Sequence, residues 1–272
     1  MKYILYFLIF IVIFFAALLK PLSVDNFKEE DYYRNTANRI EAINTLDKNE
    51  NNIKIGWNRI NFTPPTPSDL AGYSGRGKYT SVKDSVFANC LFIESEKGNY
   101  LVLNFDLILI HQTFSTALEQ QLLSDKNLNL KGIYYTCSHS HSSFGGWAKG
   151  LLAKFALGGY QPEIVNFMVK QTKKMVYKAY KSRSAVEIAF TKIKLTDYVL
   201  NRVVRGNEVD DQLRLVVFKN KRNEKSALIS FSAHPTIIPM KEKFLSGEFP
   251  TICSNNLIDS LNLQSLLYVS GA

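Results

Sequence analysis

The chain has 272 residues, of which 46% are hydrophobic and 21% are charged. This length allows one sizeable core or two small ones, and the composition excludes a chain that is disordered throughout. The formal net charge is +9, but the basic residues are spread along the chain and form no basic-aromatic reader motif for nucleic acid. We therefore expect no nucleic-acid partner.

The N-terminus is strongly apolar. Residues 3–19 carry no charge, and a run of this length is at the short end of the about 17–25 apolar residues that span a bilayer. The segment Ala16-Ala17 is followed by Leu18-Leu19-Lys20-Pro21, which is a poor site for a signal peptidase. We favour an uncleaved membrane anchor over residues 1–23, with a cleaved signal as the alternative. The rest of the chain is then expected to be membrane-anchored and extracytoplasmic, or secreted if the segment is cleaved.

Residues 24–52 are polar and are interpreted as a linker with one short helix around Asp31–Leu46. The folded domain is expected over residues 53–272. In chain order, alternation and apolar runs predict strands at 53–57, 88–94 and 100–105, a helix at 113–123, a strand at 132–137, the longest helix at 163–181, and strands at 186–194, 213–220, 226–232 and 266–269.

Strands interleaved with helices predict the α/β class: a layered domain with mixed β-sheets flanked by helices, preceded by an N-terminal transmembrane or signal helix. The longest helix carries a local excess of basic residues between 170 and 183. We interpret these residues as a solvated helix face, and contact with anionic membrane lipid is the alternative. The three cysteines, Cys90, Cys137 and Cys253, form no CxxC, so neither a cysteine zinc site nor a disulfide framework is implied.

Three of the four histidines follow predicted strands. His139 and His141 form an H-x-H step after the strand at 132–137, and His234 follows the strand at 226–232. In extended backbone an H-x-H step places both imidazoles on one face, and strand ends in α/β folds are where sites gather. Neutral imidazole is the commonest zinc ligand, and catalytic zinc usually keeps three protein ligands with one open position. The sequence thus indicates a metal site, with hydrogen-bonded loop histidines as the alternative, and His111 is interpreted as structural.

Other catalytic templates fit poorly. The stretch Gly72–Arg76 lacks the final glycine of a G-x-S-x-G nucleophile elbow, and neither a P-loop nor a G-x-G-x-x-G is present. The metallo-β-lactamase pattern H-x-H-x-D-H fails at Ser143 and Phe144.

From residue 53 to its end, the chain resembles the neutral/alkaline (non-lysosomal) ceramidases. The ordered pair of histidine segments is the most specific part of the resemblance. The stretches that carry it, in the family's order, are Gly56 to Pro65, Leu70 to Tyr73 with Arg76 and Asp84, Asn104-Phe105-Asp106, His139 to Gly146, Asn201-Arg202, His234-Pro235-Thr236, and Ser246 to Pro250, where the family has Ser-Gly-Asp-Tyr-Pro.

The resemblance implies a zinc-dependent amidohydrolase that hydrolyses the N-acyl bond of ceramide-like lipids. His139 and His234 would be zinc ligands, His141 a near-site histidine that orients or protonates, and Arg202 a residue on the substrate side. In that family zinc activates a water molecule or polarises the amide carbonyl. The alternatives are a family member that hydrolyses another amide or ester, and a binding protein without catalysis.

The chain departs from the family pattern in two ways. Ser143-Phe144 replaces the family's Gly-Pro in the histidine loop, and we expect this to change the wall of the pocket. The family's Gly-Asp-x-Ser-Pro segment would begin directly after Ser270-Gly271-Ala272, and its glutamate and tyrosine ligands come later still. The resemblance therefore predicts that residues 53–272 form a partial catalytic domain that lacks its C-terminal part.

Overall fold

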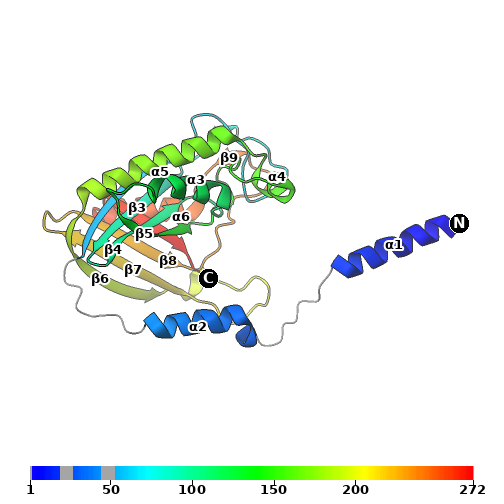
Figure 1. Cartoon of the computed structure of the whole chain (residues 1–272), viewed down its shortest axis with the longest axis horizontal. Helices are drawn as coiled ribbons and strands as arrows, with labels where there is room; N and C mark the ends of the chain where they lie inside the picture. Colours follow the sequence, from blue (N-terminus) through cyan, green and yellow to red (C-terminus); the bar gives the residue numbers. More distant parts are fainter. Residues whose placement is uncertain (1, 19–26, 44–52, 272) are drawn as a thin grey trace. The chain divides into compact units, whose positions relative to one another are not determined.

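The structure is a computed structural model that describes residues 2–18, 27–43 and 53–271, and the chain divides into two compact units, residues 1–49 and 50–272. The first unit contains α1 (Lys2–Leu18), the 3-10 turn η1 (Phe27–Glu29) and α2 (Asp31–Ile43) (Figure 1). Helix α2 matches the helix predicted in the linker, and residues 44–46 of that prediction lie outside the described residues. Within the described ranges, no helix combines the length and the apolarity needed to cross a membrane. The role of the N-terminal segment as an anchor or signal stays a prediction.

The second unit is built on an eight-stranded sheet with the order β10-β8-β7-β6-β1-β3-β4-β5. Most neighbours are antiparallel, but β4 with β5 and β8 with β10 are parallel, which confirms the predicted mixed sheet. Each predicted strand is present with small shifts at its ends. The strands are β1 (Lys54–Asn61), β3 (Phe87–Ser95), β4 (Gly98–Phe105), β5 (Leu130–Cys137), β6 (Ser184–Lys194), β7 (Gln212–Asn220), β8 (Lys225–Phe231) and β10 (Ser265–Ser270).

The sheet has two halves that meet at one corner. Strands β1 and β6 pair only through Lys54↔Ala185 and Ile55↔Ser184. Beyond this corner the halves pack on each other, because one apolar cluster combines residues of β1 and β3 with residues of β7 and β10. Its buried members are Ile55, Trp57, Leu91, Phe218 and Leu267.

Helices cover the sheet. Helices α3 (Gln112–Leu122) and α5 (Pro162–Ser182) enclose the largest core cluster with β1, β3, β4 and β5, and α6 (Glu248–Leu261) packs on β10 (Figure 1). Helix α5 buries Met168, Met175 and Ala179 at helical spacing. Lys170 and Lys174 are exposed on the same helix, which supports the interpretation of a solvated basic face. The remaining elements are the short helix α4 (Leu151–Leu157), the 3-10 turn η2 (Thr196–Tyr198) and the parallel pair β2 (Ser81–Val82) and β9 (Phe244–Leu245).

The loops that follow β5 and β8 lie side by side. The backbone N–H of Ser246 donates to the carbonyl oxygen of Ser142 at 2.9 Å, which links the loop after β5 to the start of α6. Leu70 forms a β-bridge with Phe144 and brings a third segment to the same place. The fold thus gathers three segments that are far apart in the sequence where the predicted histidines lie.

Candidate metal centre

The backbone at the histidine pair differs from the prediction. Strand β5 ends at Cys137, and His139 has a φ of +63°, in the left-handed region. The H-x-H step is therefore not extended, and the expectation of a strand-like step was wrong. The two rings still face one site because the loop turns at His139 and is held by buried Ser140.

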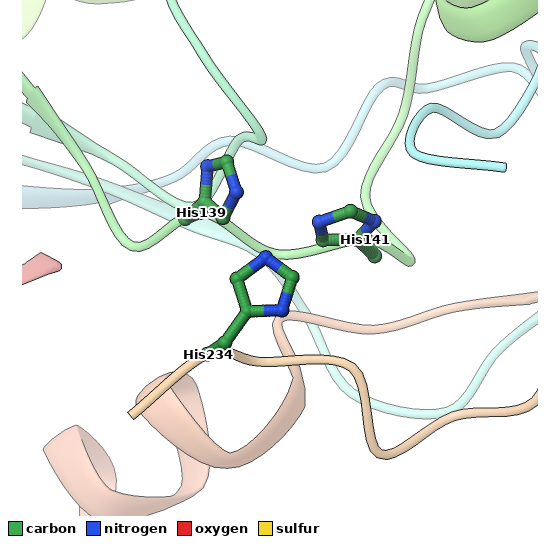
Figure 2. A group of neighbouring side chains, drawn as sticks. All are labelled: His139, His141 and His234. Atoms are coloured by element: carbon green, nitrogen blue, oxygen red, sulfur yellow. The ribbon is translucent and has the colours of Figure 1, made fainter. Parts of the chain in front are cut away.

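The three imidazoles converge. Figure 2 shows His139 and His141 from one loop and His234 from another, with their rings turned toward a common centre. The ring centroids are 5.1 Å apart for His139 and His141, 4.9 Å for His139 and His234, and 4.8 Å for His141 and His234. One nitrogen of each ring lies within 4.8 Å of the others. A tetrahedral zinc with bonds of about 2.05 Å separates two nitrogens by about 3.4 Å, a distance within this limit.

Carbonyl groups hold the outer nitrogens of two rings. His139 Nδ1 lies 2.7 Å from the Ile108 carbonyl oxygen, and His141 Nδ1 lies 3.2 Å from that of Gly72. A carbonyl only accepts, so each Nδ1 must carry the proton, and the lone pair of a neutral ring is then on Nε2. A carbonyl on the outer nitrogen is the usual support of a metal-ligating histidine. His234 Nδ1 has the Thr236 hydroxyl at 3.3 Å in the equivalent position.

His141 has an unsatisfied lone pair. Its Nε2 is buried and has no hydrogen-bond partner among the described residues. Burial lowers the pKa of His141 to about 4, with smaller contributions from the charges of His139, His234 and Arg202, while the hydrogen bond to Gly72 opposes the shift. Burial also lowers the pKa of His234. Both rings are therefore neutral near pH 7, so each offers a lone pair. The three histidines together fit a metal ion with a free proton acceptor beside it.

A cavity adjoins His234. Its volume is about 470 Å³, and Arg202 lines it beside this histidine. Its lining combines apolar and polar side chains: Tyr198, Val199, Leu200, Arg202, Ser232, Ala233, His234 and Thr236. The charge of Arg202 also acts on His141, so the arginine predicted on the substrate side lies near the predicted histidines.

His111 lies at the N-cap of α3, where its Nδ1 accepts from the Thr113 backbone N–H at 3.2 Å. This contact agrees with the structural role predicted for it.

Ser143 and Phe144 were expected to form part of the pocket wall, but both are completely buried. The Phe144 ring packs on Phe62 in the main core, with centroids 5.8 Å apart, so this expectation was wrong.

Sequence reasoning assigned no role to three residues that hold the site. The Tyr73 ring lies 5.3 Å from that of His141, Arg76 donates to the His141 carbonyl oxygen at 2.8 Å, and the Glu248 carboxylate accepts from the His141 backbone N–H at 2.7 Å. All three belong to motifs that the resemblance used. Nothing in the sequence indicates their partner, because the contacts join segments more than 60 residues apart.

The family model described as neutral/alkaline non-lysosomal ceramidase, N-terminal, matches residues 54–257. Among solved structures, the neutral ceramidase from Pseudomonas aeruginosa is similar with a TM-score of 0.70 and 15% identity, over 80% of this chain and 38% of that chain. A ceramidase complexed with C2 is similar with a TM-score of 0.67 and 16% identity, over 80% of this chain and 37% of that chain. The chain thus spans less than two fifths of either structure, and no curated protein matches it.

Proposed function

The chain belongs to the neutral/alkaline non-lysosomal ceramidase family, and from this we propose that it acts as a zinc-dependent amidohydrolase on the N-acyl bond of ceramide-like lipids. The observation that carries the proposal is the convergence of His139, His141 and His234 around a buried, unpartnered Nε2. Zinc suits this donor set because neutral imidazole is its commonest protein ligand.

His139 and His234 would hold the zinc ion through Nε2, with their outer nitrogens supported by Ile108 and Thr236. Bound zinc supplies Lewis-acid chemistry, which lowers the pKa of water and polarises an amide carbonyl. His141 would act as the proton carrier. Its neutral, unpartnered Nε2 can accept a proton from the attacking water and pass it to the leaving amine nitrogen.

The cavity beside His234 fits an amphiphilic substrate. Tyr198 and Leu200 offer apolar surface, while the Arg202 guanidinium can donate hydrogen bonds to the polar part of a lipid amide. The relatives of similar structure are both named as ceramidases. Arg202 would thus orient the amide near the histidines, and the apolar lining would receive hydrocarbon.

Zinc content per chain and turnover of a short-chain N-acyl sphingoid base, measured on the same samples, test the proposal. We expect about one zinc per chain in the full chain, by plasma mass spectrometry, and its loss in His139→Ala and in His234→Ala. His141→Ala should keep the metal and lose turnover by about 10²–10⁴-fold, because it removes only the proton carrier. Loss of zinc therefore identifies the metal ligands, and loss of turnover with zinc retained identifies the catalytic histidine.

His111→Ala is the matched control, since it removes a histidine that caps α3 and lies outside the histidine cluster. It should keep both zinc and turnover. A full chain without zinc would overturn the metal mechanism. Zinc with turnover of small amides or esters, but not of the lipid amide, would overturn the substrate assignment and leave the hydrolase.

A further inference from the structure

Glu248 is a buried carboxylate that lies between the two histidine loops. It is 1% exposed and stands in the first turn of α6. Its φ is +57°, in the left-handed region that non-glycine residues rarely adopt. Such a conformation persists only where the surroundings enforce it, and it is often found at functional sites.

The two carboxylate oxygens of Glu248 bind different loops. Oε2 accepts from the His141 backbone N–H at 2.7 Å and from the Ser140 hydroxyl at 3.3 Å. Oε1 accepts from the Ile238 backbone N–H at 3.1 Å, in the loop that carries His234. The side chain therefore spans from one histidine segment to the other. Because both oxygens already accept hydrogen bonds from the protein, it acts on the histidines through their backbone.

Hydrogen bonds at the start of α6 hold Glu248 in place. Its backbone N–H donates to the Ser246 hydroxyl at 2.8 Å, and that hydroxyl donates to Asp84 Oδ2 at 2.6 Å. The other oxygen of Asp84 accepts from the Gly247 backbone N–H at 2.8 Å. These bonds fix the start of α6, so the position of the Glu248 carboxylate is set before any metal binds.

Arg76 completes the arrangement with the opposite charge. It is 3% exposed, and it donates to the His141 carbonyl oxygen at 2.8 Å and, through Nε, to the Glu242 carbonyl oxygen at 3.1 Å. Glu248 thus binds N–H groups of the two loops, while Arg76 binds carbonyl groups of the same two chain regions. The charge of each lowers the cost of burying the other.

We propose that Glu248 is a positioning residue, which sets the separation of the His139–His141 loop from the His234 loop and thereby the geometry of the metal centre. The inference rests on the proposed function in that it assumes a metal held by His139 and His234 beside His141. In this role the Glu248 carboxylate keeps the two histidine loops at a fixed separation and forms no bond to the metal or to the substrate.

The test is the binding of Co²⁺, added alone to the metal-free full chain and followed by its visible absorption, in the wild type, Glu248→Gln and Glu248→Asp. Glutamine keeps the size but places an amide NH₂ where an oxygen accepts from a backbone N–H. We expect Co²⁺ binding about 10–100-fold weaker and an altered spectrum in Glu248→Gln, as for other outer supports of metal ligands. Glu248→Asp keeps two acceptor oxygens with a shorter reach, and its affinity should lie between the two.

Thr251→Val is the control. Thr251 is buried on the same helix, and its hydroxyl donates to Asp106 Oδ2 at 2.7 Å, so the variant weakens another anchor of α6 without removing a contact to the histidine loops. It should bind Co²⁺ with the wild-type affinity and spectrum. A Thr251→Val loss equal to that of Glu248→Gln would overturn the proposal, as would an unchanged Glu248→Gln.

A second measurement tests the role of Glu248 independently of metal binding. It uses the imidazole NMR signals of the metal-free chain, labelled at histidine. Glu248→Gln should shift the ring signals of His141 and His234 and leave His111 unchanged, whether or not the chain binds metal. If the wild type binds no Co²⁺, the zinc mechanism falls, and these signals still decide the role of Glu248. Unchanged His141 and His234 signals would overturn it.

Discussion

At the scale of single residues, Gly72 is a constrained backbone position in contact with His141. Its φ is +105°, and its carbonyl oxygen lies 3.2 Å from His141 Nδ1. A Cβ at this position would lie 2.6 Å from the His141 Cα, a distance that requires one segment to move. We expect Gly72→Ala to displace His141 and to lower turnover at least about 10-fold, because the ring loses its outer support.

Gly75→Ala provides the matched comparison. Gly75 also has a positive φ, +75°, in the same loop, but no described atom lies within 4 Å of the Cβ that alanine would add. This variant should show the strain of the left-handed conformation, about 1–2 kcal/mol of unfolding free energy, with normal turnover. Urea unfolding and lipid-amide turnover of both variants check the prediction. Equal turnover in the two would contradict the proposed role of the Gly72 contact.

The candidate histidines could be predicted from the sequence, and their supports could not. His139, His141 and His234 stood out because each follows an apolar strand, and strand ends place side chains at one edge of a sheet. Glu248 gave no such signal. Its partners are backbone groups more than 100 residues away on one side and 10 residues away on the other, and backbone N–H groups are the same in every sequence.

At the scale of elements, the strands and the longest helix were predictable because burial gives the apolar residues of their sequences a clear periodicity. Helix α6 was missed. It contains Pro250, two consecutive asparagines and β-branched residues, all of low helix propensity. It forms because Phe249, Cys253 and Leu257 lie four apart and pack on the cluster of β8 and β10. Tertiary burial of one face outweighs weak local preference here.

The contact between α5 and β1 depends on Gly56. A Cβ at Gly56 would lie 1.9 Å from the Ala179 carbonyl oxygen, which is helix backbone and cannot rotate away. Gly56→Ala should therefore push α5 off the sheet and lower the unfolding free energy by about 1–3 kcal/mol, the usual cost of overpacking a core. Urea denaturation of the full chain measures this change.

Gly159→Ala tests whether the loss is specific to that contact. Gly159 lies before α5, no described atom is within 4 Å of the methyl group that alanine would add, and its φ is not in the left-handed region. We expect its unfolding free energy to stay within about 0.5 kcal/mol of the wild type. A loss in Gly56→Ala no larger than in Gly159→Ala would contradict the close helix–strand packing.

At the scale of the whole molecule, the histidine cluster joins the two halves of the sheet. His139 and His141 follow β5 in one half, and His234 follows β8 in the other, while the strands of the two halves pair only at the β1–β6 corner. The loops after β5 and β8 are held together by the buried groups around Glu248. Proton or metal binding at the histidines therefore bears on the stability of the entire domain, because it acts where the two halves meet.

The pH dependence of stability in the metal-free chain follows from His141. Burial lowers its pKa from 6.5 to about 4, and the groups that face it are His139, His234, Arg202 and the Tyr73 ring. Between these two pH values the unfolded chain binds a proton at this residue and the folded chain does not. Stability must then fall as the pH falls through this window, and the loss is complete below about 4.

Replacement of His141 by asparagine isolates this contribution, because the carboxylates that titrate in the same range are present in both chains. We expect the unfolding free energy of the wild type, relative to His141→Asn, to decrease steadily from pH 6.5 to 4 and to level off below. Urea unfolding at a series of pH values, with chelator present, measures the difference. Parallel pH profiles for the two chains would mean that His141 is as accessible to protons in the folded state as in the unfolded one, and the buried, neutral Nε2 on which the proposed proton transfer depends would not exist.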